Sequence, residues 1–261
     1  MKAKLNVYRV SYSYHSLEGE TPALSTISFS VDAGEFLAVV GPSGCGKSTL
    51  LSLLCGLAKP ESGYIQVNGT PIEHARNSIG YMLQKDHLLE WRSVLSNVSL
   101  GLEIQKKLTK DSQAELMQML NAYGLGQFMD KLPSELSGGM RQRAALIRTL
   151  ALKPDILLLD EPFSALDYQT RLSVCDDISS IIRKQQKTAV LVTHDLSEAI
   201  STADRIVILS SRPGKVKTIL PITFEKGKNL SPMERRNTPE FSQYFQLIWK
   251  ELKNDEISQA V

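Results

Sequence analysis

Residues 41–48 have the composition and spacing of a loop that binds phosphate groups. They read Gly-Pro-Ser-Gly-Cys-Gly-Lys-Ser and match the pattern G-x-x-x-x-G-K-[ST], between an apolar run and a predicted helix. Glycines let successive backbone N–H groups curl round a phosphate, and the N-terminus of the following helix adds a favourable dipole. Lys47 would then reach the β- and γ-phosphates of a nucleotide, and the Ser48 hydroxyl would ligate Mg²⁺. The residues predicted to hold the nucleotide at this loop are Gly41, Pro42, Ser43, Gly44, Cys45, Gly46, Lys47, Ser48 and Thr49.

Two neighbouring carboxylates follow the apolar run 156–159, which is predicted to be a buried strand. Open α/β sheets place their ligand sites at the carboxyl ends of their strands. Asp160 would therefore orient Mg²⁺ or its water, and Glu161 would polarise the attacking water as a general base. His194 follows a second apolar run, 188–193, so we expect it at the same sheet edge, within reach of a γ-phosphate.

Short apolar runs and helical patterns alternate along the chain in the manner of an α/β protein. Strands are predicted at 5–10, 25–31, 36–40, 64–67, 156–159, 188–193 and 205–209, and helices at 48–58, 168–184 and 196–202. A helical pattern from about 108 to 152 interrupts this core. Phe241, Tyr244, Phe245, Ile248 and Leu252 recur at helical spacing near the end, and we expect this stripe to pack on its own domain.

The composition narrows the class of protein. The 261 residues carry 30 Lys and Arg against 28 Asp and Glu, and the net charge of +2 gives no broad basic field for nucleic acid. The three cysteines have neither zinc-site spacing nor the density of a disulfide scaffold, which fits a reducing cytosol. Since no apolar run reaches the roughly 18 residues of a membrane span and the start lacks a secretory signal, we expect a soluble chain whose membrane role needs a partner.

Residues 136–143, Leu-Ser-Gly-Gly-Met-Arg-Gln-Arg, resemble the Leu-Ser-Gly-Gly-Gln signature of ABC ATPases. Further marks of that family also match: Gln84 as the Q-loop glutamine, 164–167 as the D-loop, His194 as the switch histidine and Tyr14 as the aromatic that stacks on adenine. The resemblance implies a P-loop (RecA-like) core with an antiparallel β subdomain and an inserted α-helical subdomain. It places the ATPase domain at 1–225, the helical subdomain at about 85–152 and a helical tail at 226–261.

The same resemblance assigns roles around ATP and Mg²⁺. Glu161, His194 and Gln84 would be catalytic, and Ser48, Gln84 and Asp160 would hold the metal. The signature, with Ser137, Gly138 and Gly139, would cap the ATP of a second copy of this ATPase, and Asp167 of the D-loop would also be a nucleotide-binding residue. Met140 replaces the usual glutamine, but the Ser137 hydroxyl and the two glycine N–H groups that form the anion site are retained, so we expect hydrolysis to survive.

In transporters of this family, the region after the Q-loop receives a coupling helix of the membrane subunit. Leu88, Leu89 and Trp91 are the candidate contacts here, although packing beneath the helical subdomain explains them equally well. Together with Arg-Pro-Gly-Lys-Val at 212–216, this stretch is similar to the importers of nitrate, aliphatic sulfonates and taurine, whose relatives import thiamine pyrimidine precursors.

The resemblance implies a homodimer at the cytoplasmic face of the cell membrane, bound to a permease and served indirectly by an extracytoplasmic solute-binding protein. Three alternatives stay open: an exporter subunit, a soluble ABC ATPase acting on nucleic acid, and a P-loop kinase. Lys47 and Ser137 are 90 positions apart and the motifs occur once, which disfavours the long coiled coil or tandem cassettes of nucleic-acid types. A kinase would need an acceptor pocket and a lid.

Overall fold

The computed structural model describes residues 4–17, 19–225, 227 and 230–259, and the described chain contains two β-sheets. One is an antiparallel sheet with the strand order β2-β1-β4-β5. Its strands are β1 (Leu5–Ser16), β2 (Gly19–Val31), β4 (Ser62–Val67) and β5 (Thr70–Pro71). Val7 of β1 lies opposite Phe29 on one side and Ile65 on the other, and all three side chains are buried. This row of apolar residues turns one face of the sheet toward the core.

The larger sheet has the strand order β10-β9-β3-β8-β7-β6. Its strands are β3 (Phe36–Val40), β6 (Ile79–Met82), β7 (Ile156–Asp160), β8 (Thr188–Val192), β9 (Arg205–Leu209) and β10 (Val216–Pro221). Strands β9, β3, β8, β7 and β6 run parallel to one another, and β10 pairs antiparallel with β9 at one edge of the sheet. Val192 pairs with Val39 and with Asp160, so β3, β8 and β7 end at one edge.

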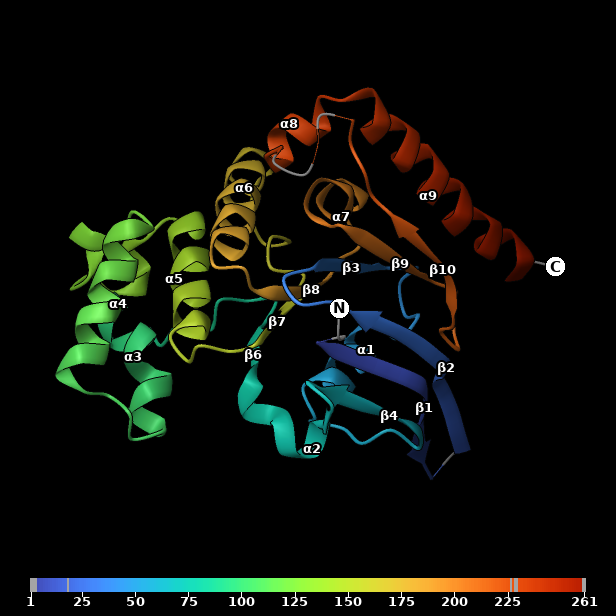
Figure 1. Cartoon of the computed structure of the whole chain (residues 1–261), viewed down its shortest axis with the longest axis horizontal. Coiled ribbons are helices and arrows are strands. Elements are labelled where there is room, and N and C mark those ends of the chain that lie inside the picture. Colours follow the sequence, from blue (N-terminus) through green and yellow to red (C-terminus); the bar gives the residue numbers. More distant parts are fainter. Residues whose placement is uncertain (1–3, 18, 226, 228–229, 260–261) are drawn as a thin grey trace.

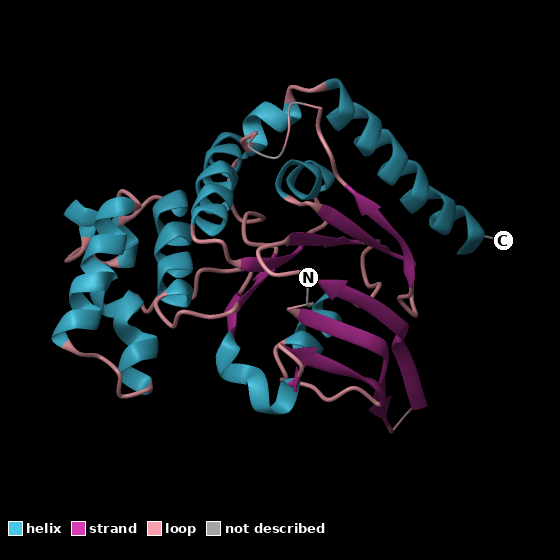
Figure 2. Cartoon of the chain, in the orientation of Figure 1, coloured by secondary structure: helices cyan, strands magenta, loops and turns pink. Residues whose placement is uncertain are grey.

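Apolar layers cover both faces of this sheet (Figure 1, Figure 2). Helix α1 (Lys47–Leu54) lies between the two sheets, where Leu50, Leu51 and Leu54 are fully buried. On the other face, α6 (Tyr168–Lys184), α7 (Leu196–Thr202) and part of α5 share a second core. Burial on both faces explains why the central strands are almost continuously apolar.

Helices α3 (Val94–Ile104), α4 (Lys110–Ala122) and α5 (Gly138–Leu150) form a separate group on the left of Figure 1. They surround their own apolar cluster, which includes Val98, Leu120 and Ile147. Helix α2 (Ile72–Ala75) and short 3-10 turns at Arg76–Ser78, Gly126–Phe128 and Pro133–Glu135 connect the elements. The group is thus an insertion between β6 and β7 of the larger sheet.

The C-terminal part contains α8 (Pro232–Arg236) and α9 (Pro239–Gln259), which lie along the top of Figure 1. Ile248 is fully buried, and Phe241, Tyr244, Phe245 and Leu252 pack against the same core as α6 and α7. The predicted packing of this stripe on its own domain is confirmed. Residue 226, the first of the predicted tail, lies outside the described residues. Within the described part of the chain, no helix is both long enough and apolar enough to cross a bilayer.

The structure also corrects several predicted boundaries. Strand β1 continues to Ser16, beyond the predicted end at residue 10. Strand β2 begins at Gly19, before the predicted start at 25, and α1 ends at Leu54 because Gly56 adopts a left-handed φ of +70°. The helical insertion begins at Val94 instead of about 108, since the Ser93 side chain accepts a hydrogen bond from the Ser96 N–H and caps α3 there.

Candidate nucleotide-binding and catalytic site

The phosphate loop joins β3 to α1 at the edge where the parallel strands end. Gly46 is the N-cap of α1 and has a φ of +101°, in the region where a side chain would be strained. A Cβ on Gly46 would also come within 2.9 Å of the Ala23 carbonyl oxygen. The loop therefore requires glycine here, as the motif predicted.

Lys47 opens α1 and turns its buried side chain back onto the loop. Its Nζ donates to the carbonyl oxygens of Gly41 at 2.8 Å and Pro42 at 2.9 Å. The ammonium of Lys47 also lies 3.9 Å from the sulfur of Cys45, and burial raises the pKa of that thiol. The lysine charge is thus held beside the backbone amides that would meet a phosphate.

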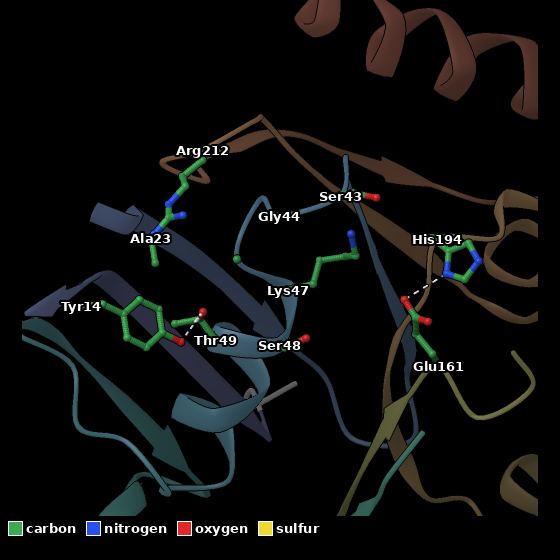
Figure 3. A pocket seen from close by; sticks show the side chains of 11 residues that line it. Tyr14, Ala23, Ser43, Gly44, Lys47, Ser48, Thr49, Glu161, His194 and Arg212 are labelled. Carbon is green, nitrogen blue, oxygen red and sulfur yellow. Dashed lines mark hydrogen bonds and ion pairs between the residues drawn. The ribbon is translucent and has the colours of Figure 1, made fainter. Parts of the chain in front are cut away.

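A cavity of about 350 Å³ opens over this loop (Figure 3). Tyr14 and Arg212 lie at one end, Lys47 in the middle, and Glu161 and His194 at the other end. The predicted residues that line it are Tyr14, Ser43, Gly44, Gly46, Lys47, Ser48, Thr49, Glu161 and His194. These predicted residues come from four separate parts of the sequence and meet in one pocket.

The two carboxylates differ in their surroundings. Asp160, the last residue of β7, accepts a hydrogen bond from the Tyr81 hydroxyl at 3.0 Å, and burial raises its pKa. Glu161 has a φ of +43°, a strained value for a side-chain-bearing residue, and its N–H donates to the Val192 carbonyl at 2.8 Å. This backbone turn aims the Glu161 carboxylate into the pocket (Figure 3).

The Glu161 carboxylate is held from two sides. His194 Nδ1 lies 3.0 Å from Glu161 Oε1, and Gln84 Nε2 donates to Glu161 Oε2 at 3.3 Å. Gln84 also donates to the Ser164 hydroxyl at 3.3 Å, which links the Q-loop to the first residue of the D-loop. The three residues predicted to be catalytic thus lie in one group of polar contacts.

A chain of polar contacts fixes the backbone on either side of His194. Thr193 donates to the buried carboxyl of Glu198 at 2.7 Å, and burial raises the pKa of Glu198 to about 7. Asp195 caps α7, and Arg171 contacts both Asp195 Oδ2 at 3.4 Å and the Leu166 carbonyl at 3.1 Å. Arg171 therefore connects the D-loop to the turn that carries the histidine.

The oxygen donors predicted for a metal come from three elements: the Ser48 hydroxyl from α1, the Asp160 carboxylate from β7 and the Gln84 amide from the loop after β6. Within the described residues, no three His, Cys, Asp or Glu side chains gather in a metal cluster. A site with few protein ligands suits Mg²⁺, which completes its shell with water and phosphate oxygens.

The signature residues do not line the pocket. Ser137 is the N-cap of α5, and its hydroxyl accepts a hydrogen bond from the Met140 N–H at 3.4 Å. Gly138 and Gly139 follow as the first helical residues, while Met140 packs into the core of the helical group. Asp167 also lies outside the pocket lining and caps α6 by accepting from the Thr170 N–H. The methionine thus leaves the cap geometry of α5 intact.

The segment after Gln84 is tied to the signature helix by ion pairs. Arg141 contacts Asp86 through Nε at 2.9 Å and Nη2 at 3.1 Å, and it contacts Glu90 at 2.7 Å. Leu88 is buried in the helical group, so packing explains this residue, whereas Trp91 is 77% exposed. Of the predicted docking contacts, Trp91 has the exposure that a partner surface needs.

Two residues that line the pocket, Ala23 and Arg212, were not predicted from the sequence. Arg212 belongs to the Arg-Pro-Gly-Lys-Val motif at 212–216, which indicated a similarity to importers but did not indicate that Arg212 lies at the nucleotide pocket. For Ala23 the residue type carries no such signal.

Comparisons with known proteins identify the family. A family model described as ABC transporter matches residues 24–164. Over 255 residues the chain is 47% identical to YtlC of Bacillus subtilis, an uncharacterized ABC transporter ATP-binding protein, and the match covers 98% of both chains. The chain belongs to the ABC transporter family. It is an ATP-binding subunit with ATPase activity coupled to transport.

Other relatives of this ABC ATPase carry more specific names. It is 37% identical over 238 residues to the aliphatic sulfonates import ATP-binding protein SsuB of Bacillus licheniformis, with 91% of this chain and 89% of the relative covered. The solved cassette MJ0796, in a dimeric post-hydrolysis state bound to ADP and Pi, matches with a TM-score of 0.71 and 28% identity, covering 84% of this chain and 99% of that one. The predicted family and the predicted fold class are therefore confirmed.

Proposed function

We propose that this ABC ATPase powers the uptake of an aliphatic sulfonate through a separate permease at the cytoplasmic face of the cell membrane. Its relative in Bacillus licheniformis, named for the import of aliphatic sulfonates, supports both the cargo class and the direction. The exposed Trp91, on the segment tied to the signature helix, is the proposed contact for the permease. An extracytoplasmic solute-binding protein would select the cargo and pass it to the permease.

The composition of the pocket carries the proposal. It unites the phosphate loop with Glu161 and His194 but contains none of the signature residues. Ser137 and Gly138 are exposed at the start of α5, where a helix N-terminus favours an anion. Two copies placed head to tail would let each signature cap the ATP of the other, and the dimeric state of the related cassette supports this arrangement.

Hydrolysis would proceed by attack of water on the γ-phosphorus of ATP. Glu161 accepts a proton as the water oxygen forms its bond to phosphorus, and the bond to the β–γ bridging oxygen breaks to give ADP and phosphate. Lys47 and the loop amides stabilise the charge that develops on the phosphate oxygens. His194 orients the carboxylate through its 3.0 Å contact with Glu161. Mg²⁺ held by Ser48, Asp160 and Gln84 would neutralise phosphate charge.

The chemical part is tested with Glu161→Gln. The variant should bind ATP with wild-type affinity but release phosphate about 100- to 10,000-fold more slowly, because the general base is lost while the loop is intact. Lys47→Ala should instead lose nucleotide binding. Rapid turnover by Glu161→Gln would remove Glu161 from this role, and unchanged ATP affinity in Lys47→Ala would contradict the phosphate-loop assignment.

The cargo is tested in the host cell. Deletion of the gene should abolish uptake of a radiolabelled aliphatic sulfonate and growth on it as the sole sulfur source, and growth on sulfate should be unaffected. The wild-type gene should restore growth, and the Glu161→Gln gene should not. Normal uptake with raised cellular sulfonate would indicate an exporter. Stimulation of ATP hydrolysis by nucleic acid, with normal sulfonate growth, would favour the nucleic-acid class.

A further inference from the structure

The loop between β9 and β10 is hydrogen-bonded to β2 and packs closely on the phosphate loop. The Gly214 N–H donates to the Ala23 carbonyl, and its own carbonyl accepts from the Ser25 N–H, each at 2.9 Å. A Cβ on Gly214 would come within 2.2 Å of the Cys45 carbonyl oxygen, so the two backbones are packed too closely for any side chain. Arg212, two residues before this contact, therefore has a defined position beside the nucleotide pocket.

Arg212 lines the pocket at the end where Tyr14 lies. Its Nε donates a hydrogen bond to the Pro22 carbonyl at 3.0 Å. Among the described residues, this is the hydrogen bond that the Arg212 side chain makes. Both Nη nitrogens remain available to a ligand. Tyr14 is fixed too, because its hydroxyl bonds to Thr49 Oγ1 at 2.9 Å.

The position of the catalytic group sets the direction in which a nucleotide would bind. Glu161 and His194 lie at the end of the pocket away from Tyr14 and Arg212 (Figure 3). Since Glu161 must face the water that attacks the γ-phosphate, the phosphates extend from Lys47 toward that end. The nucleoside is consequently left at the end formed by Tyr14, Ala23 and Arg212.

We propose that Arg212 is a nucleoside-binding residue that holds the adenine of ATP between its guanidinium and the Tyr14 ring. A guanidinium is planar and weakly hydrated, so it stacks on an aromatic face in a way that a lysine ammonium does not. The apolar Ala23 would form the wall between the two planes. The inference rests on the proposed function, because it takes the direction of the nucleotide from the role of Glu161.

The test compares ligands with and without a nucleoside. Dissociation constants for ATP, ADP and inorganic tripolyphosphate are measured by calorimetry with Mg²⁺ on the wild type, Arg212→Ala, Arg212→Lys and Lys215→Ala. Lys215 is an exposed residue of the same loop, so its variant is a control for the loss of one positive charge. Because Arg212 is also exposed, circular dichroism should show all variants folded.

Arg212→Ala should weaken ATP and ADP by a similar factor, about 3- to 30-fold, and leave tripolyphosphate unchanged. Arg212→Lys should recover little of the loss, and Lys215→Ala should match the wild type. Unchanged ATP affinity would overturn the proposal. Full recovery with lysine, or an equal loss for tripolyphosphate, would also overturn it, because either result means a phosphate contact. If the wild type bound no ATP at all, the proposed function itself would fail.

Discussion

His194 Nδ1 lies 3.0 Å from Glu161 Oε1, although the two residues follow different strands. The contact forms because β7 and β8 are neighbouring strands whose last residues, Asp160 and Val192, pair with each other. Gln84 holds the other carboxylate oxygen from the loop after β6. The carboxylate of Glu161, the proposed general base, is thus oriented by residues from both flanking segments, so a movement of either segment can change its position.

Loss of the histidine contact should reduce turnover without affecting nucleotide binding. In His194→Ala, the Glu161 carboxylate keeps its contact with Gln84 but loses the imidazole, and we expect phosphate release to fall about 100-fold. The affinity for ATP should stay within about twofold of the wild type, because Lys47 and the loop are unchanged. Steady-state phosphate release and equilibrium ATP binding measure the two effects. A similar loss in both quantities would show that His194 acts on binding instead.

The ion pairs between the signature helix and the segment after Gln84 should differ in strength. Asp86→Asn removes a part-buried carboxylate that contacts two nitrogens of Arg141, so we expect a loss of about 1–3 kcal/mol in the free energy of unfolding. Glu90→Gln removes the same charge from an exposed site on the same arginine and should cost less than about 1 kcal/mol. Urea unfolding of the two variants provides the comparison. Equal losses would contradict the structural difference between the pairs.

The raised pKa of Glu198 should make the free energy of unfolding depend on pH. Its carboxyl is buried, and its pKa is raised from 4.5 to about 7 in the folded chain, so folding binds a proton. The free energy of unfolding should therefore fall as pH rises from about 4.5 to 7, by about 3 kcal/mol from this group, and stay level above that range. Glu198→Gln mimics the protonated acid and should remove this part of the pH dependence. Urea unfolding at pH 5 and pH 8 tests it, and an equal pH effect in both proteins would contradict the prediction.

Sequence patterns predicted those parts of the fold where local and tertiary signals agree. The helices at 168–184 and 196–202 have the predicted bounds, since Asp167 and Asp195 are cap residues that can be read from the sequence. The residue pattern did not predict helix α3, although α3 lies within the helical subdomain that the family resemblance places at about 85–152. Its Asn97 is fully buried and bonds to the carbonyls of Leu89, Arg92 and Ser93, and a buried polar residue hides the apolar pattern of a helix.

The residues of the nucleotide site also fall into two groups, those that local sequence motifs predicted and those that tertiary contacts position. The motifs predicted the phosphate loop and the acidic residues because each of these features depends on a few consecutive residues. Arg212 could not be assigned in this way, because its position depends on a carbonyl of Pro22, 190 residues earlier in the chain. The link from Arg171 to Asp195 likewise depends on the packing of α6 against α7. Such contacts follow from tertiary structure and leave no local pattern.

If the signature of one copy caps the ATP of another, ATP should hold two copies of Glu161→Gln together, and light scattering measures the mass of the resulting particle. The variant should have the mass of a dimer with ATP and of a monomer with ADP. Glu161→Gln combined with Ser137→Arg should bind ATP equally well yet remain a monomer, because the arginine side chain blocks the start of α5. A dimer of the double variant with ATP, or a monomer of Glu161→Gln at saturating ATP, would contradict the claim.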